Sequence, residues 1–336
     1  MILVDGLYVH FGGAMRVLEY LVRELDRRGS DFHLLADRRC EGVFDGLRSV
    51  EYLDASLWNR ARWYRRDLSR FTAVMCVGNI APPVKLPVPV YTLSHNINVL
   101  TLEGFPSFPA RVKGWLKRVI YRHYRRNTDY WLVQTENTRQ TVIRCLHESE
   151  DRVKTLLFYY IPASLAGCSR GDDYLYVSTY YRPKHHEELL AAWRILHGRG
   201  VDKTLHLTLE AGATAILAQV AQAQREGVRV VNHGFLPMEE MPALYAASKA
   251  TVYPSINESL GLGIVEAITA GCDVIGADLP YMHAVCRPSA VFDPFSPESI
   301  ADAVERYEKG GMPRSELLVR DQIDTLIDVL EGRAQI

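Results

Sequence analysis

The sequence lacks several features that would place it in a specialised class of protein. Its 336 residues carry 39 Lys+Arg and 40 Asp+Glu, so it has no positive excess of the kind that nucleic-acid-binding domains show, and no nucleic-acid partner is expected. No apolar run approaches the roughly 20 residues that span a bilayer. The segment Met1–Gly6 lacks the basic start and long apolar core of a signal peptide. We therefore expect a soluble, cytoplasmic protein whose membrane contact, if it has one, is peripheral.

Paired cysteines and metal-ligand spacings are also missing. The six cysteines form no Cys-x-x-Cys pair and lie at positions 40, 76, 145, 168, 272 and 286. Most of them, such as Cys76, lie in apolar runs where cysteine acts as a small buried hydrophobe. The adjacent His185 and His186 have no acidic partner at ligand spacing. These patterns favour a reducing compartment and predict no metal site.

The near-zero total charge conceals two oppositely charged halves. Residues 1–160 carry 24 Lys+Arg and 17 Asp+Glu, a net of +7. Residues 161–336 carry 15 and 23, a net of -8. The first half is therefore expected to favour an anionic surface or substrate.

Short apolar runs alternate with segments of helical period along the whole chain. The strands predicted in the first half are 1–7, 32–36, 73–77, 88–93, 130–134 and 154–158. Those predicted in the second half are 174–178, 204–209, 228–232, 250–253, 273–276 and 290–292. Several are apolar on both faces, which is typical of parallel strands covered by helices. The clearest helix follows the first strand and has one apolar stripe, formed by Val17, Leu18, Leu21, Val22 and Leu25.

A polar, glycine-bearing stretch at 167–173 separates the two series of strands and helices. The predicted fold is α/β, with two doubly wound Rossmann-like domains that face each other across a cleft. The expected domains are 1–165 and 172–312. A C-terminal helix within 313–336 is expected to pack back towards the first domain.

The densest chemical signal lies in residues 253–271, Tyr-Pro-Ser-Ile-Asn-Glu-Ser-Leu-Gly-Leu-Gly-Ile-Val-Glu-Ala-Ile-Thr-Ala-Gly. A strand is predicted to end at Pro254 and a helix to begin near Gly261, so that loop N–H groups and the helix dipole favour an anion. Glu258 and Glu266 bracket this turn. Their carboxylates suit the hydroxyls of a sugar and a ribose, although one could simply complement the dipole and the other be solvated.

This segment resembles glycosyltransferase family 4, whose hallmark is the pattern Pro-Ser-x-x-Glu-x-x-Gly-x-x-x-x-Glu-Ala. The matching residues are Pro254, Ser255, Glu258, Gly261, Glu266, Ala267 and Gly271. The resemblance covers most of 174–309 well and the first half more loosely. It implies the GT-B fold and a retaining, metal-independent transfer from a nucleotide-diphosphate sugar, carrying UDP or GDP, that is a substrate rather than a cofactor.

The resemblance also implies which residues form the site. The expected catalytic residues are Glu258, His95 and Lys184. The residues expected to contact the donor are Gly12, Gly13, Arg182, Lys184, Ser259, Leu260, Gly261, Leu262, Gly263 and Glu266. Taken alone, the glycine pair could be a plain tight turn, and His95 a strand-end histidine satisfied by its neighbours.

Two positions depart from the family pattern. Thr179 stands where the family carries an arginine, and Arg182 either replaces that arginine or is solvated. The family's Asn-Gly pair is replaced within 159–163.

Residues 111–126 predict a basic amphipathic helix. Its cations are Arg111, Lys113, Lys117, Arg118, Arg122, Arg125 and Arg126, and they alternate with Trp115, Leu116, Val119, Ile120 and Tyr124. Residues 58–66 form a second cluster of arginines and aromatics. Either such a helix packs its apolar stripe on the sheet and leaves a solvated basic back, or it lies on an anionic membrane.

Together these features predict a cytoplasmic glycosyltransferase of cell-surface polysaccharide or lipopolysaccharide assembly. Its acceptor is expected to be a saccharide, lipid-linked, at the inner face of the cell membrane. Two alternatives stay open: a catalytically weak GT-B scaffold or nucleotide-sugar-binding partner, which the departures at Thr179 and 159–163 favour, and a GT-B nucleotide-sugar epimerase.

Overall fold

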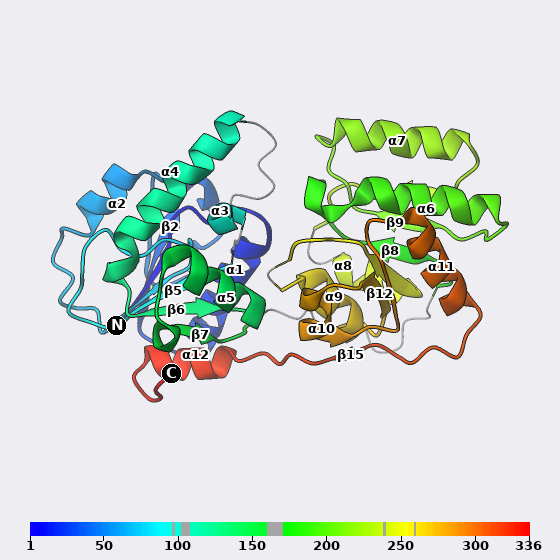
Figure 1. Cartoon of the computed structure of the whole chain (residues 1–336). Helices are drawn as coiled ribbons and strands as arrows, with labels where there is room; N and C mark the ends of the chain where they lie inside the picture. The colour runs from blue at the N-terminus through cyan, green and yellow to red at the C-terminus, as the bar shows by residue number, and fades with distance from the viewer. Residues whose placement is uncertain (96–97, 102–107, 160–170, 238–239, 259) are drawn as a thin grey trace. The chain divides into compact units, whose positions relative to one another are not determined.

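The computed structural model describes residues 1–95, 98–101, 108–159, 171–237, 240–258 and 260–336 (Figure 1). The chain divides into two compact units. Unit 1 comprises Met1–Tyr160 together with Arg320–Ile336, and unit 2 comprises Ile161–Val319. Each unit is built on its own parallel sheet.

Unit 1 contains a seven-stranded parallel sheet in the order β3-β2-β1-β4-β5-β6-β7. The strands are β1 (Ile2–Gly6), β2 (Phe32–Asp37), β3 (Val50–Leu53), β4 (Ala73–Cys76), β5 (Val90–Ser94), β6 (Tyr130–Val133) and β7 (Val153–Thr155). The central strand β1 is buried along its whole length because helices cover both faces of the sheet. The strand order reverses between β1 and β4, which is where ligands bind in open α/β sheets.

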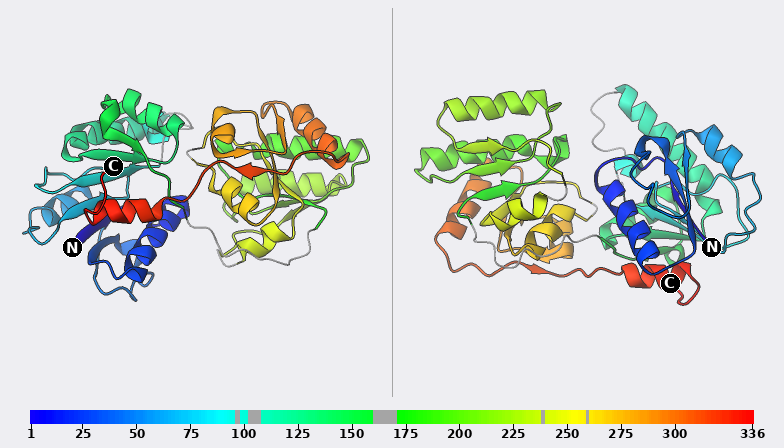
Figure 2. Two further views of the ribbon diagram at one scale, coloured as in Figure 1. Left: turned by 90° about the horizontal axis from the view of Figure 1, so that it is seen from below. Right: turned by 180° about the vertical axis from the view of Figure 1, so that it is seen from behind.

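Two helical layers enclose this sheet. The helices of unit 1 are α1 (Gly12–Arg27), α2 (Leu57–Trp63), α3 (Asn98–Thr101), α4 (Phe108–Tyr124), α5 (Glu136–Leu146) and α12 (Ile323–Leu330). The apolar stripe predicted for α1 is confirmed, and it packs in one core with β1, β2 and α12. Figure 2 shows α12 lying beside α1, and Ser30 Oγ donates to Glu331 Oε1 at 2.8 Å across the two segments. The end of the chain therefore completes the core of unit 1.

Unit 2 contains a six-stranded parallel sheet in the order β10-β9-β8-β11-β12-β14. Its strands are β8 (Tyr174–Tyr176), β9 (Leu205–Leu207), β10 (Val230–Asn232), β11 (Ala250–Tyr253), β12 (Asp273–Ala277) and β14 (Ala290–Phe292). Its helices are α6 (His186–Gly198), α7 (Thr214–Arg225), α8 (Met241–Ala246), α9 (Leu262–Thr269), α10 (Pro280–Val285) and α11 (Pro297–Glu308). The order reverses between β8 and β11.

The predicted pair of doubly wound parallel α/β units is confirmed. The prediction missed β3, which lies at the sheet edge and is half-buried throughout, so its sequence lacks a long apolar run. It also missed the short antiparallel pair of β13 (Cys286–Arg287) and β15 (Glu316–Leu317). Among the described helices, none is both long and apolar enough to cross a membrane.

Candidate functional site

The predicted motif lies at the carboxyl ends of β8 and β11, the point of strand reversal in unit 2. Two hydrogen bonds join the segments that leave these strands. The Ile256 N–H donates to the Pro183 carbonyl at 2.8 Å, and Ser255 Oγ donates to the same carbonyl at 3.2 Å. The short 3₁₀ turn Arg182–Lys184 is thereby held against the loop that carries Glu258.

Lys184 and Glu258, 74 residues apart in sequence, form an ion pair at this point. Lys184 Nζ lies 2.5 Å from Glu258 Oε1, and Tyr253 Oη donates to the same oxygen at 2.9 Å. The two charged side chains are 22% and 11% exposed, so a ligand can still reach them. Tyr176 Oη donates to the Lys184 carbonyl at 2.9 Å and fixes the backbone of the lysine. The arrangement offers a cation and an acceptor oxygen side by side.

Buried tyrosines surround Glu258. Burial, together with the negative charge of Glu258, raises the pKa of Tyr176, Tyr253 and Tyr281 well above its usual value. These phenols therefore stay protonated and act as hydrogen-bond donors. Tyr281 Oη donates to the Ser255 carbonyl at 2.6 Å, which ties α10 to the loop after β11.

Two glycines lie at the start of α9, where space for a side chain is limited. Gly261 precedes the helix with φ +72, and a Cβ there would lie 2.8 Å from Ile264 Cδ1. A Cβ on Gly263 would lie 3.2 Å from Tyr253 Cε2. The N-cap residue is Gly261, which has no side chain to cap the helix, so the first backbone N–H groups suit an anion. Leu260 is buried and Leu262 half-buried, whereas predicted Ser259 lies outside the described residues.

Glu266 is buried within α9. It is 6% exposed, and its Oε2 accepts a hydrogen bond from Tyr245 Oη at 3.0 Å. The alternative in which this glutamate is merely solvated is wrong. A tyrosine on α8 fixes its orientation.

The cations and histidines beside Lys184 have different surroundings. Arg182 is exposed, and within the described ranges it makes no ion pair. The ring nitrogen Nδ1 of His185 lies 3.1 Å from the Pro294 carbonyl. Burial and the charge of Lys184 lower the pKa of His186 to about 3, so it is neutral. The described part of the chain contains no group of three or more His, Cys, Asp or Glu side chains that could hold a metal ion.

Unit 1 has a second polar cluster at the carboxyl ends of its own strands. His95 follows β5, and its backbone N–H donates to Asn79 Oδ1 at 2.8 Å. Asn79 Nδ2 must then face His95 Nε2, 3.1 Å away, so the imidazole proton resides on Nδ1. Burial lowers the pKa of His95 to about 4, so the ring is neutral. Nδ1 is buried and has no hydrogen-bond partner in the described ranges, so among these residues only Nε2 of the ring is paired.

Strained backbone supports this cluster. Tyr8 and Asn79 follow β1 and β4 and have φ +74 and +64, values that cost energy for tyrosine and that asparagine tolerates. A Cβ on the intervening Gly78 would lie 2.4 Å from the Leu7 carbonyl oxygen, so glycine is required. Asn79 is not among the residues predicted for the site, although a Gly-Asn pair after a buried strand indicates a turn. Predicted Gly12 and Gly13 are exposed at the start of α1.

The second basic cluster, residues 58–66, is divided between surface and core: Trp58, Arg62, Arg65 and Arg66 are exposed, whereas Arg60 is not. Arg60 is 1% exposed, and its guanidinium lies 2.8 Å from Asp5 of β1. Trp63 and Tyr64 are also buried. The physical reason is that the buried carboxylate of Asp5 needs a counter-charge, which Arg60 supplies from α2.

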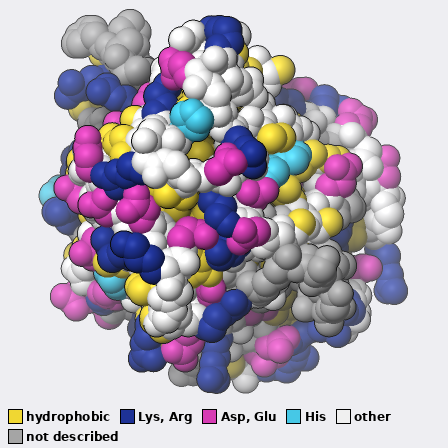
Figure 3. All heavy atoms as spheres, turned by 90° about the vertical axis from the view of Figure 1, so that its right-hand side faces the viewer, with side chains coloured by type: hydrophobic (Ala, Val, Ile, Leu, Met, Phe, Trp, Pro, Cys, Tyr) yellow, Lys and Arg dark blue, Asp and Glu magenta, His cyan; other side chains and the backbone are white. Residues whose placement is uncertain are grey.

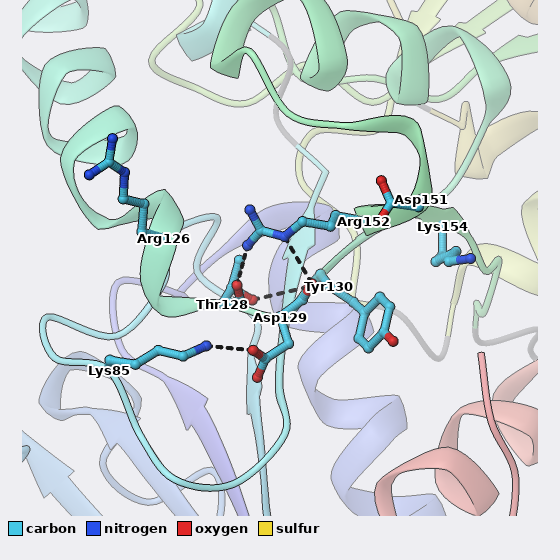
Figure 4. A pocket seen from close by; sticks show the side chains of 8 residues that line it. All are labelled: Lys85, Arg126, Thr128, Asp129, Tyr130, Asp151, Arg152 and Lys154. Carbon is cyan, nitrogen blue, oxygen red and sulfur yellow. Dashed lines mark hydrogen bonds and ion pairs between the residues drawn. The ribbon is translucent and has the colours of Figure 1, made fainter.

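A pocket of about 650 Å³ lies at the opposite, amino-terminal edge of the unit 1 sheet (Figure 4). It is lined by Lys85, Arg126, Thr128, Asp129, Tyr130, Asp151, Arg152 and Lys154. Lys85 pairs with Asp129 at 2.5 Å, and Arg152 pairs with Glu148 at 2.6 Å. These pairs connect the segments around the starts of β6 and β7. None of the predicted site residues lines the pocket.

Each unit is a parallel α/β sheet with one order reversal, as are the two Rossmann-like domains of the GT-B fold. The chain superposes on sucrose-phosphate synthase from Thermosynechococcus elongatus with a TM-score of 0.71 and 15% identity, covering 92% of this chain and 89% of that one. It superposes on WaaG, a glycosyltransferase involved in lipopolysaccharide biosynthesis, with a TM-score of 0.65 and 16% identity, covering 92% and 91%. The predicted GT-B fold is confirmed.

Sequence comparison adds a family match for one part of the chain. Residues 169–319 match the family model of glycosyl transferases group 1. An O-antigen chain mannosyltransferase B of Escherichia coli is 29% identical over 191 residues, which is 51% of this chain and 49% of that protein. The chain spans a smaller share, 20%, of a serotype-specific mannosyltransferase WbdA of Escherichia coli, to which it is 28% identical over 161 residues.

Proposed function

We propose that this protein is a retaining glycosyltransferase that moves a sugar from a nucleotide-diphosphate donor to a saccharide acceptor. The observation that carries the proposal is the Lys184–Glu258 pair at 2.5 Å, whose glutamate lies in the loop that leads to the glycine-preceded start of α9. The family match covers this same region, 169–319. The pair thus lies within the matched region and at the order reversal where open parallel sheets bind ligands.

The residues of unit 2 suit the separation of charge in such a transfer. When the bond between the sugar carbon and the diphosphate breaks, negative charge grows on the leaving oxygen. The ammonium of Lys184 and the N–H groups at the start of α9 can neutralise this charge without a metal. We assign Glu258 to the donor sugar and Glu266 to the ribose, because both offer oriented carboxylate oxygens.

Retention follows from attack on the face that the diphosphate leaves. The acceptor hydroxyl forms the new bond to the sugar carbon, and its proton passes to the departing diphosphate oxygen. This route needs no protein general base. It is compatible with a neutral His95, whose Nδ1–H we assign as a hydrogen-bond donor to a sugar hydroxyl.

We further propose that the acceptor is a lipid-linked saccharide of cell-surface polysaccharide or lipopolysaccharide assembly at the cytoplasmic face of the membrane. O-antigen mannosyltransferases are among the sequence relatives, and a lipopolysaccharide glycosyltransferase shares the fold. Mannose is accordingly the first sugar to test. UDP and GDP donors are equally compatible with the described residues.

A panel of UDP- and GDP-sugars, including GDP-mannose, tests the proposal. We expect one donor to release nucleotide diphosphate. Glu258→Gln should abolish this release, and the surface change Glu298→Gln should leave it unaltered. Isomerised sugar would instead identify an epimerase, and binding without turnover in the presence of glycan acceptors would favour a scaffold. Product anomers assigned by NMR test retention, and unchanged turnover in EDTA tests metal independence.

A further inference from the structure

Helix α4 presents a row of large apolar side chains to solvent. Val112, Trp115, Leu116 and Val119 are 41%, 55%, 50% and 44% exposed. At about 100° per residue, the four fall within an arc of roughly 100° on one helix face. Of the stripe predicted to pack on the sheet, Trp115, Leu116 and Val119 are thus exposed, whereas Ile120 and Tyr124 are half-buried.

Other side chains attach α4 to unit 1. Gly114 is buried, and Tyr121 packs against the core that contains Trp131. At the end of the helix, Arg122 Nε donates to the Cys145 carbonyl at 3.0 Å, and Arg125 donates to the Leu146 carbonyl at 2.5 Å. These contacts attach the helix through side chains other than those of the exposed apolar row.

The charge around the row has one sign. Residues 104–128 contain seven Lys and Arg and no Asp or Glu. Arg111 and Lys117 are exposed on the same helix as the apolar row. By contrast, acidic and basic side chains intermingle over most of the unit 2 face that Figure 3 shows. An acid-free, basic helix with an exposed apolar row complements a surface that is both anionic and apolar.

Most of the apolar row lies on the half of α4 that is nearer the His95 cluster of unit 1. The chain leaves β5 at the carboxyl edge of the sheet, just before His95, and re-enters at the amino edge of β6. α4 must therefore return across the sheet, so its first turns lie towards the edge that carries His95. Figure 1 shows α4 on the outside of unit 1, with its first turns projecting beyond the strands.

We propose that α4 docks unit 1 on a membrane of anionic phospholipid. Trp115 and Leu116 enter the boundary between headgroups and acyl chains, and Arg111 and Lys117 contact lipid phosphates. Docking in this way brings the His95 edge towards lipid-borne molecules. The proposal concerns binding alone and does not depend on transferase activity.

Flotation of the full chain with vesicles tests the apolar contact. We expect binding to phosphatidylcholine vesicles that contain 30 mol% phosphatidylglycerol, and about tenfold weaker binding to phosphatidylcholine alone. Trp115→Ser with Leu116→Ser should lower binding to the anionic vesicles about tenfold, whereas Phe235→Ser, at a 78% exposed aromatic of unit 2, should not. Equal binding of wild type and the double variant would overturn the proposal.

A second pair of variants tests the charges. Arg111→Glu with Lys117→Glu should abolish the preference for anionic lipid, whereas Arg287→Glu with Lys309→Glu, on the exposed surface of unit 2, should preserve it. Arg122 and Arg125 are avoided because they hold the helix in place.

Two measurements separate this proposal from its rivals. The wild-type protein could form a dimer in light scattering that Trp115→Ser with Leu116→Ser dissociates, and fail to bind vesicles. This result would assign the row to a contact with a second copy of the chain and overturn membrane docking. Donor hydrolysis in the absence of lipid should be unchanged in the same variant. Lost vesicle binding with intact hydrolysis supports docking, and vesicle binding by a protein that turns over no donor would contradict only the proposed function.

Discussion

Replacing the buried Arg60 should destabilise unit 1 strongly. Its guanidinium pairs with Asp5 at 2.8 Å and also donates to the Ala81 and Ile80 carbonyls at 2.8 and 3.0 Å. Arg60→Met keeps much of the apolar stem and removes all of these bonds. The carboxylate of Asp5 is then left buried with hydrogen bonds from Tyr64 Oη and the Leu7 N–H.

The expected loss follows from the burial of both partners. Asp5 and Arg60 are each 1% exposed, and removing one member of a buried pair costs about 3–5 kcal/mol. Arg66, whose side chain is 57% exposed, pairs with Glu51 at 2.8 Å, and such a surface pair contributes about 0–1 kcal/mol. Arg66→Met is therefore the matched control. At about 2 kcal/mol per molar urea, Arg60→Met should lower the unfolding midpoint by roughly 2 M and the control by less than about 0.5 M.

Urea unfolding followed by tryptophan fluorescence measures the effect. Four of the five tryptophans lie in unit 1, so the signal reports mainly on that unit. Asp5→Asn added to Arg60→Met removes the orphaned charge and should recover part of the loss. A midpoint for Arg60→Met within about 0.5 M of that for Arg66→Met would refute the assignment of a buried, compensated pair.

Three further expectations concern single positions. Lys184→Ala should lower donor turnover about a hundredfold in a coupled nucleotide-release assay, because Lys184 pairs with the site carboxylate of Glu258. Lys309→Ala, the control, should not lower it. Similar rates for the two variants would contradict the role of Lys184. Gly261→Ala should lower the melting temperature of unit 2 more than Gly310→Ala. Both glycines have positive φ, +72 and +78, but only at Gly261 would a Cβ meet a neighbour, Ile264 Cδ1 at 2.8 Å, which must shift. Equal shifts in calorimetry would remove the argument from close packing. His95 has a pKa of about 4 in the folded protein, below the usual value of about 6.5 for an unfolded chain. The unfolded state therefore binds more protons between these values. The stability of unit 1 should accordingly fall as the pH drops from about 6.5 to about 4. His95→Gln should make this part of the pH dependence shallower in urea unfolding, and an unchanged slope would show that His95 is not buried as a neutral ring.

Much of the fold follows from local pattern. Apolar runs such as Leu3–Val4 and Val274–Ile275 face helices on both sides of a sheet, so they predict parallel strands without any tertiary information. The half-exposed edge strand β3 is the counterexample, because a strand that buries little apolar surface leaves little trace in the sequence.

The candidate site was only partly predictable. Glycines and glutamates at fixed spacing in 253–271 indicate an anion site, since the requirement for loop N–H groups and close approach is local. Tyr253 as a partner of Glu258 could not be inferred in this way, nor could Asn79 as the group that orients His95. Their roles depend on side-chain contacts that the strand topology creates.

The sequence by itself determined the two parallel α/β halves, the opposite charges of those halves and the residue types at the anion-binding turn, because periodicity, composition and glycine placement are local properties. Only the tertiary structure decided that Lys184 meets Glu258, that Arg60 is a buried counter-ion and that the apolar row of α4 faces solvent. In each case the local helical or loop pattern is compatible with both a buried and a solvent-exposed side chain. Which environment a side chain occupies depends on the strands and helices that chain topology brings beside it.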